Sequence, residues 1–205
     1  MSAALSDLKT GDLVLFTEEG RSRGLLRWWR RQSWAHVGLV VREPADPEPL
    51  LWEARGQGPR RRSVVVRLAP RIAGSPGRVS VRCLNQPLTA PQRARLNALR
   101  RDWTGQAPKR GLLDLMAAAD GGWVGTKPEH LGTPTDAELV AQVYQRLGLL
   151  SDVAQGGTPP SRYRPRRFGA GAGLELKHGY ALGPEVVLHD PAGAEDWQGA
   201  RPQPA

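Results

Sequence analysis

The sequence predicts an α+β fold with an antiparallel sheet. Strand-like segments fill the first half of the chain, and helical patterns dominate the second half. Strands followed by helices are typical of α+β domains. The 205 residues suit a single domain with its own core. We place this domain at residues 1–190 and expect a disordered tail at 191–205, because the composition of that segment is poor in core-forming residues.

Short apolar or valine-rich runs, separated by turn signals, predict the strands. Gly11 and Asp12 supply the turn that leads into the first of them, and a Pro-rich turn precedes the third. Strands are predicted over residues 11–16, 36–43, 50–55, 63–70 and 78–84, and two short strand-like pieces at 174–182 and 185–190. The absence of an internal repeat agrees with one domain.

Apolar residues at helical spacing and capping residues predict the helices. The predicted ranges are 23–34, 89–105, 110–122 and 133–150. Thr89 is a plausible N-cap for the second helix, and Pro91 fits its first turn. Thr135 and Glu138 have the spacing of a capping box at the start of the last helix, which Gly148 ends.

The chain is strongly basic, with a net charge of +9 and a pI near 10.7. Such a charge attracts phosphates of nucleic acids or anionic lipids. No zinc-finger spacing, aromatic RNA-binding signature or recognition helix is present, so nucleic acid is not an expected partner. Tryptophans among arginines could instead contact an anionic membrane surface, or the tryptophans could pack on the sheet. These residues are Arg27, Trp28, Trp29, Arg30 and Arg31.

No stretch is long and apolar enough to span a membrane, and the N-terminus lacks the pattern of a secretory signal. We therefore expect a cytoplasmic protein, with peripheral membrane attachment as an alternative. The single cysteine, Cys83, excludes an intrachain disulfide and a multi-cysteine zinc site. Its strand-like surroundings predict a packed small side chain rather than a nucleophile. Neither a cofactor nor a metal is expected.

Three segments contain the residues that suggest chemistry: SWAHVGLVV at 33–41, LLWEA at 50–54 and TDAELVAQVYQRLGLL at 135–150. With GDLVLF and GLLRWWRRQ before them, their order and spacing resemble the circularly permuted papain-like hydrolases of the NlpC superfamily, in particular the YiiX/YaeF-like branch. The resemblance covers roughly residues 9–190. It implies a permuted papain-like fold, with an antiparallel sheet or small barrel packed against helices.

The resemblance also implies roles for individual residues. In that family a Cys at the start of the helix is the nucleophile, the strand His is its base, and a third polar group orients the imidazole. His36 and Glu53 match the last two, but Asp136 stands at the position of the Cys. The implied substrates are amides or esters of peptides, lipids or acylated proteins. The decisive residue for this chemistry is therefore replaced.

Three explanations of Asp136 remain open. The first is that Asp136 is an ordinary first-turn acid favoured by the helix dipole. The second is that it is a permanent anion that pairs with His36 as imidazolium and raises the histidine pKa. The third is that it forms part of a metal or phosphate site with His36 and Glu53. The second explanation predicts a catalytically degenerate relative that keeps its cleft as a binding or scaffolding module for a peptide, lipid or acyl-amide ligand. The alternative is an active amidase or esterase whose nucleophile at position 136 was altered or is supplied otherwise.

Overall fold

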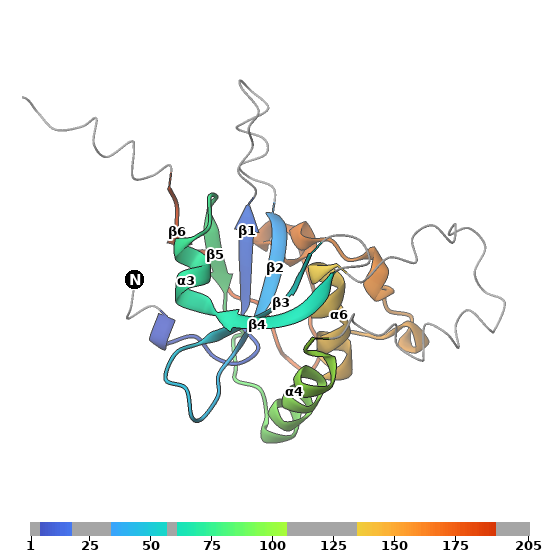
Figure 1. Ribbon diagram of the computed structural model, residues 1–205. Coiled ribbons are helices and arrows are strands. Elements are labelled where there is room, and N and C mark those ends of the chain that lie inside the picture. The colour runs from blue at the N-terminus through green and yellow to red at the C-terminus, as the bar shows by residue number, and fades with distance from the viewer. Residues whose placement is uncertain (1–4, 18–33, 57–60, 106–134, 192–205) are drawn as a thin grey trace, which may run out of the picture.

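A six-stranded antiparallel sheet forms the centre of the protein (Figure 1). The computed structural model describes residues 5–17, 34–56, 61–105 and 135–191. The strands are β1 (Leu13–Thr17), β2 (Trp34–Val41), β3 (Leu50–Arg55), β4 (Arg62–Arg67), β5 (Val79–Arg82) and β6 (Val186–His189). Their order is β4-β3-β2-β1-β5-β6. The described strands form an open sheet with β4 and β6 at its edges, and together with the helices they confirm the α+β class.

The sheet is buried on both faces, which explains why its central strands are apolar at nearly every position. Leu13 and Leu15 of β1 pack into the larger core, whereas Val14 and Phe16 pack into a second core on the opposite face. Helices α4 (Ala90–Trp103) and α6 (Asp136–Arg146) contribute to the larger core, and α3 (Leu68–Ala73) contributes to the second. The helices therefore lie on opposite faces of the sheet (Figure 1).

Both long helices begin at their predicted N-caps, Thr89 and Thr135, and each start forms a capping box, which was predicted only for the second. Thr89 accepts a hydrogen bond from the backbone N–H of Gln92, and Thr135 accepts one from the backbone N–H of Glu138. The side chains of Gln92 and Glu138 return to the cap backbone, so two otherwise unpartnered N–H groups are satisfied at each helix start. Helix α6 packs against β2 and β3, and eight of its side chains are buried.

Two predicted strands differ from the structure. The strand predicted to reach residue 70 ends at Arg67, and α3 follows, because Pro70 is tolerated in a first helical turn and Leu68 and Ile72 bury their side chains in the second core. Residues 174–182 form only an isolated bridge from Leu182 to Leu84. Positive φ angles at His178 and Gly179 interrupt that extended run.

Other predictions concern the single cysteine and segments that are not described. Cys83 directly follows β5 and is exposed, so the prediction of a packed side chain was wrong. The helices predicted at 23–34 and 110–122 lie outside the described residues, except for Trp34, which begins β2. Residues 192–205 of the predicted tail also lie outside them. No helix in the described ranges is long and apolar enough to cross a membrane.

Arg82 ties β5 to the C-terminal part of the chain. This part consists of the 3₁₀ turns η3 (Val153–Gln155), η4 (Pro160–Arg162), η5 (Pro165–Phe168) and η6 (Ala170–Ala172), followed by β6. The buried guanidinium of Arg82 donates to the carbonyl oxygens of Phe168, Leu182 and Gly183, at 2.9, 2.8 and 2.7 Å. One side chain thus satisfies three backbone acceptors in a segment that has little regular structure.

Arg82→Met should lower the free energy of unfolding by about 3 kcal/mol, because three carbonyl oxygens lose a charged donor inside the protein. Urea denaturation followed by circular dichroism measures this loss. Arg67→Met is the matched control, because the Arg67 side chain is 63% exposed and pairs only at the surface, with Glu48; it should change stability by less than about 1 kcal/mol. Equal effects of the two substitutions would contradict the role assigned to Arg82.

Candidate functional site

The candidate site lies where β2 and β3 separate and the N-terminus of α6 enters between them. Along β2, residues 36–39 pair with β1, but pairing with β3 is confined to residues 39–41. The backbone N–H of Val37 instead donates to Oδ2 of Asp136, at 2.8 Å. The first residue of α6 therefore takes the hydrogen bond that a neighbouring strand would otherwise accept.

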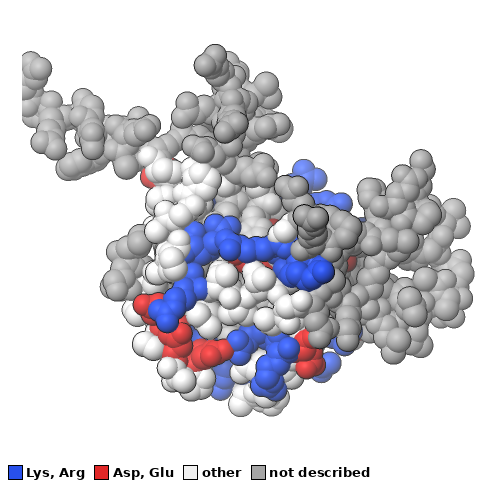
Figure 2. All heavy atoms as spheres, in the orientation of Figure 1, with Lys and Arg blue, Asp and Glu red and all other residues white. Residues whose placement is uncertain are grey.

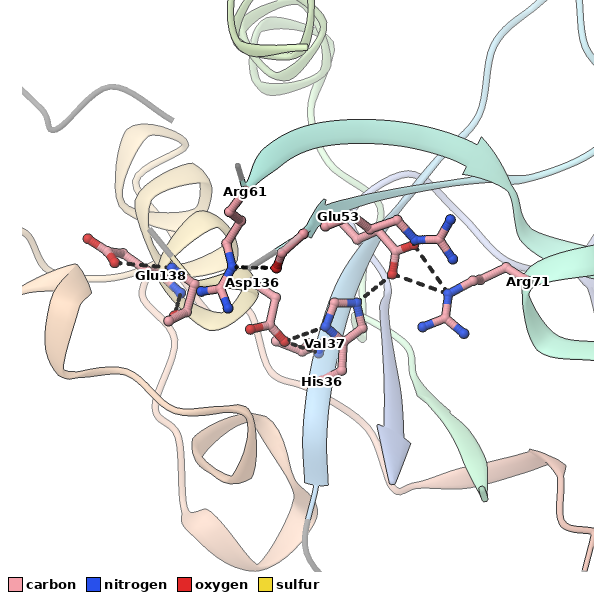
Figure 3. A network of polar contacts seen from close by, with 10 residues as sticks. His36, Val37, Glu53, Arg61, Arg71, Asp136 and Glu138 are labelled. Atoms are coloured by element: carbon pink, nitrogen blue, oxygen red, sulfur yellow. Dashed lines mark hydrogen bonds and ion pairs between the residues drawn. The ribbon is translucent and has the colours of Figure 1, made fainter. Parts of the chain in front are cut away.

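His36 lies between two carboxylates. Its Nδ1 is 2.8 Å from Oδ2 of Asp136, and its Nε2 contacts Oε2 of Glu53 (Figure 3). The His36 side chain is 22% exposed and that of Asp136 is 11% exposed, whereas Glu53 is fully buried. The structure thus brings together His36, Glu53 and Asp136, as the sequence predicted, from β2, β3 and α6.

The hydrogen bonds define the protonation state of the imidazole. A carboxylate can only accept, so each ring nitrogen must donate, and His36 is an imidazolium. Burial alone would lower the pKa of His36, but the hydrogen bonds and charges of Asp136 and Glu53 outweigh it and raise the pKa to about 9. His36 therefore carries its proton at neutral pH.

The two carboxylates are correspondingly held ionised. Burial works to raise the pKa of Asp136, yet the hydrogen bond and charge of His36 and the backbone N–H of Val37 hold it below its ordinary value. Burial likewise opposes ionisation of Glu53, and the hydrogen bond and charge of His36, with the charges of Arg71 and Arg55, lower its pKa. Each charge in the site thus depends on its neighbours.

Two arginines complete the site, and sequence analysis missed both. Arg55 and Arg71 place their Nε atoms 2.7 and 3.2 Å from Oε1 of Glu53. The guanidinium of Arg71 also lies over the ring of Phe16, with Cζ 4.1 Å from the ring centroid. Arg55 could have been found, because it lies two residues after Glu53 on the same face of a strand. Arg71 could not, because it belongs to α3, a helix that was not predicted and whose first three residues were assigned to the end of a strand.

The arrangement does not fit a divalent ion. Asp136 and Glu53 lie at opposite nitrogens of one imidazole, so their oxygens and a ring nitrogen do not converge on a common point. Within the described ranges, no group of three or more His, Cys, Asp or Glu residues is placed to hold a metal. The metal explanation of Asp136 thus finds no support in the geometry.

The remaining candidate residues lie elsewhere. The basic and aromatic residues Arg27, Trp28, Trp29, Arg30 and Arg31 lie outside the described residues. Cys83 directly follows Arg82, which pairs with Leu13 at one end of β1. His36 pairs with Phe16 at the other end of that strand. Leu13 and Phe16 are separated by about 10 Å along β1. Cys83 therefore does not belong to this site.

Comparisons with known proteins give little further information. No protein-family model matches the chain, and no curated protein matches it. Among solved structures, the chain is similar to one described as metalloprotein YiiX from Escherichia coli O157:H7, with 18% identity and a TM-score of 0.43. The match covers 89% of this chain and 97% of that chain.

The ion pairs of His36 predict how stability depends on pH. Its pKa is higher in the folded protein than the 6.5 of an unperturbed histidine, so its contribution is complete below pH 6.5 and is lost as pH rises to about 9. The contributions of Asp136 and Glu53 have the opposite sign and disappear in acid, as pH falls below their ordinary values of 3.8 and 4.5. Urea denaturation from pH 5 to 10 should show that the free energy of unfolding falls on the alkaline side, by on the order of 3 kcal/mol.

Asp136→Asn should move the alkaline loss to lower pH, because one of the two anions that hold the His36 proton is removed. His178→Asn is the control, since His178 is exposed and has a positive φ that asparagine tolerates. It should leave the pH profile unchanged. A profile flat from pH 6 to 9 in the unsubstituted protein would contradict the ion pairs.

Proposed function

We propose that this chain is a catalytically inactive relative of papain-like cysteine amidases and peptidases, which uses the site around His36 to bind a ligand rather than to cleave it. The observation that carries the proposal is that both ring nitrogens of His36 face carboxylates, one of which is Asp136 at the start of α6. The motif order quoted above supports the permuted papain-like fold, and the entry of α6 between β2 and β3 is consistent with it.

Hydrolysis by a thiol nucleophile depends on two features that this site lacks. The nucleophile is a thiolate, stabilised at a helix N-terminus and paired with a histidine that can accept and return a proton. In this protein a carboxylate occupies the helix start, and it is a poor nucleophile toward an amide. Carboxylates hold both N–H groups of the His36 imidazolium, so neither is free to pair with a thiolate or to protonate a leaving group.

The described residues offer no replacement nucleophile beside His36. The hydroxyl of Thr135 accepts the hydrogen bond of the helix cap. Partial burial and the neighbouring Asp12 carboxylate raise the pKa of the Cys83 thiol to about 11, so it is protonated at neutral pH as well as distant. These observations favour binding over the alternative of an active amidase or esterase.

What remains is a polar site that is suited to recognition. His36 and Asp136 keep part of their surface accessible, and Asp136 fixes the imidazole without any exchange of protons. A peptide, lipid or acyl-amide ligand could be held there by contacts that, in a hydrolase, would orient a substrate. The function proposed is therefore that of a binding or scaffolding module.

Asp136→Cys tests the proposal, because it restores the thiol that the sequence pattern lacks. In a Cys83→Ser background, the introduced thiol should lie against Nδ1 of His36 and ionise. Alkylation by iodoacetamide at pH 6 should then be at least about tenfold faster than that of Cys83 in the unsubstituted protein. Mass spectrometry of the labelled peptide measures both rates.

The unsubstituted protein should show no turnover of a panel of amide and ester substrates under the same conditions. Turnover that disappears in His36→Ala would contradict the proposal and support the active hydrolase. If the introduced thiol is alkylated no faster than Cys83, the site is not a cysteine-hydrolase site that has lost its nucleophile.

A further inference from the structure

Two guanidinium groups contact the same carboxylate, that of Glu53. The Nε atoms of Arg55 and Arg71 lie 2.7 and 3.2 Å from one oxygen of Glu53, and that of Arg71 donates a hydrogen bond to it. Two positive charges that share one oxygen repel each other, and Glu53 also has to balance His36 on its second oxygen. The carboxylate brings the arginines together without neutralising them.

Only one nitrogen of each guanidinium is engaged in this contact. Within the described ranges, neither the terminal nitrogens of Arg55 nor those of Arg71 lie within hydrogen-bonding distance of an acceptor, since the contacts of both side chains run through Nε. The Arg55 side chain is 49% exposed and the Arg71 side chain 19% exposed. Both side chains are thus partly exposed, and their terminal N–H groups make no hydrogen bond to the described part of the chain.

The charges of the site do not balance. His36, Arg55 and Arg71 carry three positive charges, while Glu53 and Asp136 carry two negative ones. Figure 2 shows Lys and Arg atoms in a band across the face on which α3 and β4 lie, with acidic atoms close beneath it. An incoming anion would relieve the repulsion between the two guanidinium groups.

We propose that the terminal nitrogens of Arg55 and Arg71 bind a phosphate group of the ligand. The inference rests on the proposed binding function of the site and names the chemical class of its ligand. A phosphate carries up to two negative charges and offers several oxygens in a tetrahedral array, so it can accept from two guanidinium forks at once. The phosphate belongs either to a lipid headgroup or to a soluble compound.

Titration with inorganic phosphate tests the site directly. The Nε–Hε signals of Arg55 and Arg71 are followed by ¹H–¹⁵N NMR at pH 7 and constant ionic strength, with chloride as the reference anion. Both signals should shift and saturate together. Arg55→Gln should weaken binding about tenfold or more, because one of the two forks is lost, whereas Arg67→Gln should leave it within about twofold.

Arg67→Gln is the matched control, because it removes the same charge from an exposed arginine of β4. Arg55→Gln is preferred to substitution of Arg71, since Arg55 is the more exposed partner of the buried Glu53 and its loss is less disruptive. Arg55→Lys should give an intermediate affinity, because it keeps the charge and loses the fork. An identical loss in the Arg55→Gln and Arg67→Gln variants would overturn the site, since it would indicate unspecific attraction to a chain of charge +9.

Vesicles distinguish the source of the phosphate. The competitor is phosphatidylcholine vesicles that contain phosphatidic acid. If they displace inorganic phosphate, the ligand is a lipid headgroup. If inorganic phosphate stays bound, the ligand is a soluble phosphate compound. Failure of the phosphate site is separable from failure of the proposed function. If the phosphate site is wrong, phosphate binding does not depend on Arg55. If the proposed function is wrong, the protein hydrolyses amides or esters and His36→Ala abolishes that activity.

Discussion

The ion pairs of His36 join two consecutive strands to a helix from the second half of the chain. The imidazolium contacts Glu53 of β3 and Asp136 of α6 while lying on β2. Because β2 and β3 separate here, no ladder joins these two strands beside His36, and the charged side chains and the Val37–Asp136 hydrogen bond take its place. The position of α6 against the sheet depends on this cluster as well as on its apolar face.

Buried charges of this kind are costly to assemble and more costly to break. Each ion loses hydration on burial, and only well-placed partners offset the loss, so removing one member typically costs about 3–5 kcal/mol. Glu53 shows the principle most clearly, because it is fully buried and contacts three cations. Such an arrangement holds protons in place, whereas a hydrolase must move one between the nucleophile and the histidine.

The sequence predicted the parts of the fold that local patterns determine. The strand at 50–55 matches β3 residue for residue, and the capping residues Thr89 and Thr135 mark where α4 and α6 begin. These features depend on alternation, capping and turn residues, which act over a few neighbouring positions. The grouping of His36, Glu53 and Asp136 was predicted instead from the resemblance of the motif order to a known family.

What could not be predicted depends on contacts between distant segments. Helix α3 follows β4 without a turn signal, and it is helical because Leu68 and Ile72 fill the second core. Arg71 enters the site through that helix and meets Glu53 only in three dimensions. The exposed position of Cys83 likewise follows from where β5 ends, which strand alternation alone does not define.

We propose that His36 is a fixed imidazolium between two carboxylates, one of which, Asp136, stands where papain-like hydrolases have their nucleophile. Ring ¹⁵N chemical shifts of His36, recorded by long-range ¹H–¹⁵N correlation at pH 7.5, test it most directly. We predict that both nitrogens are protonated at that pH, because the pKa of His36 is raised to about 9. One unprotonated ring nitrogen at pH 7.5 would leave His36 able to act as a base and would contradict the account.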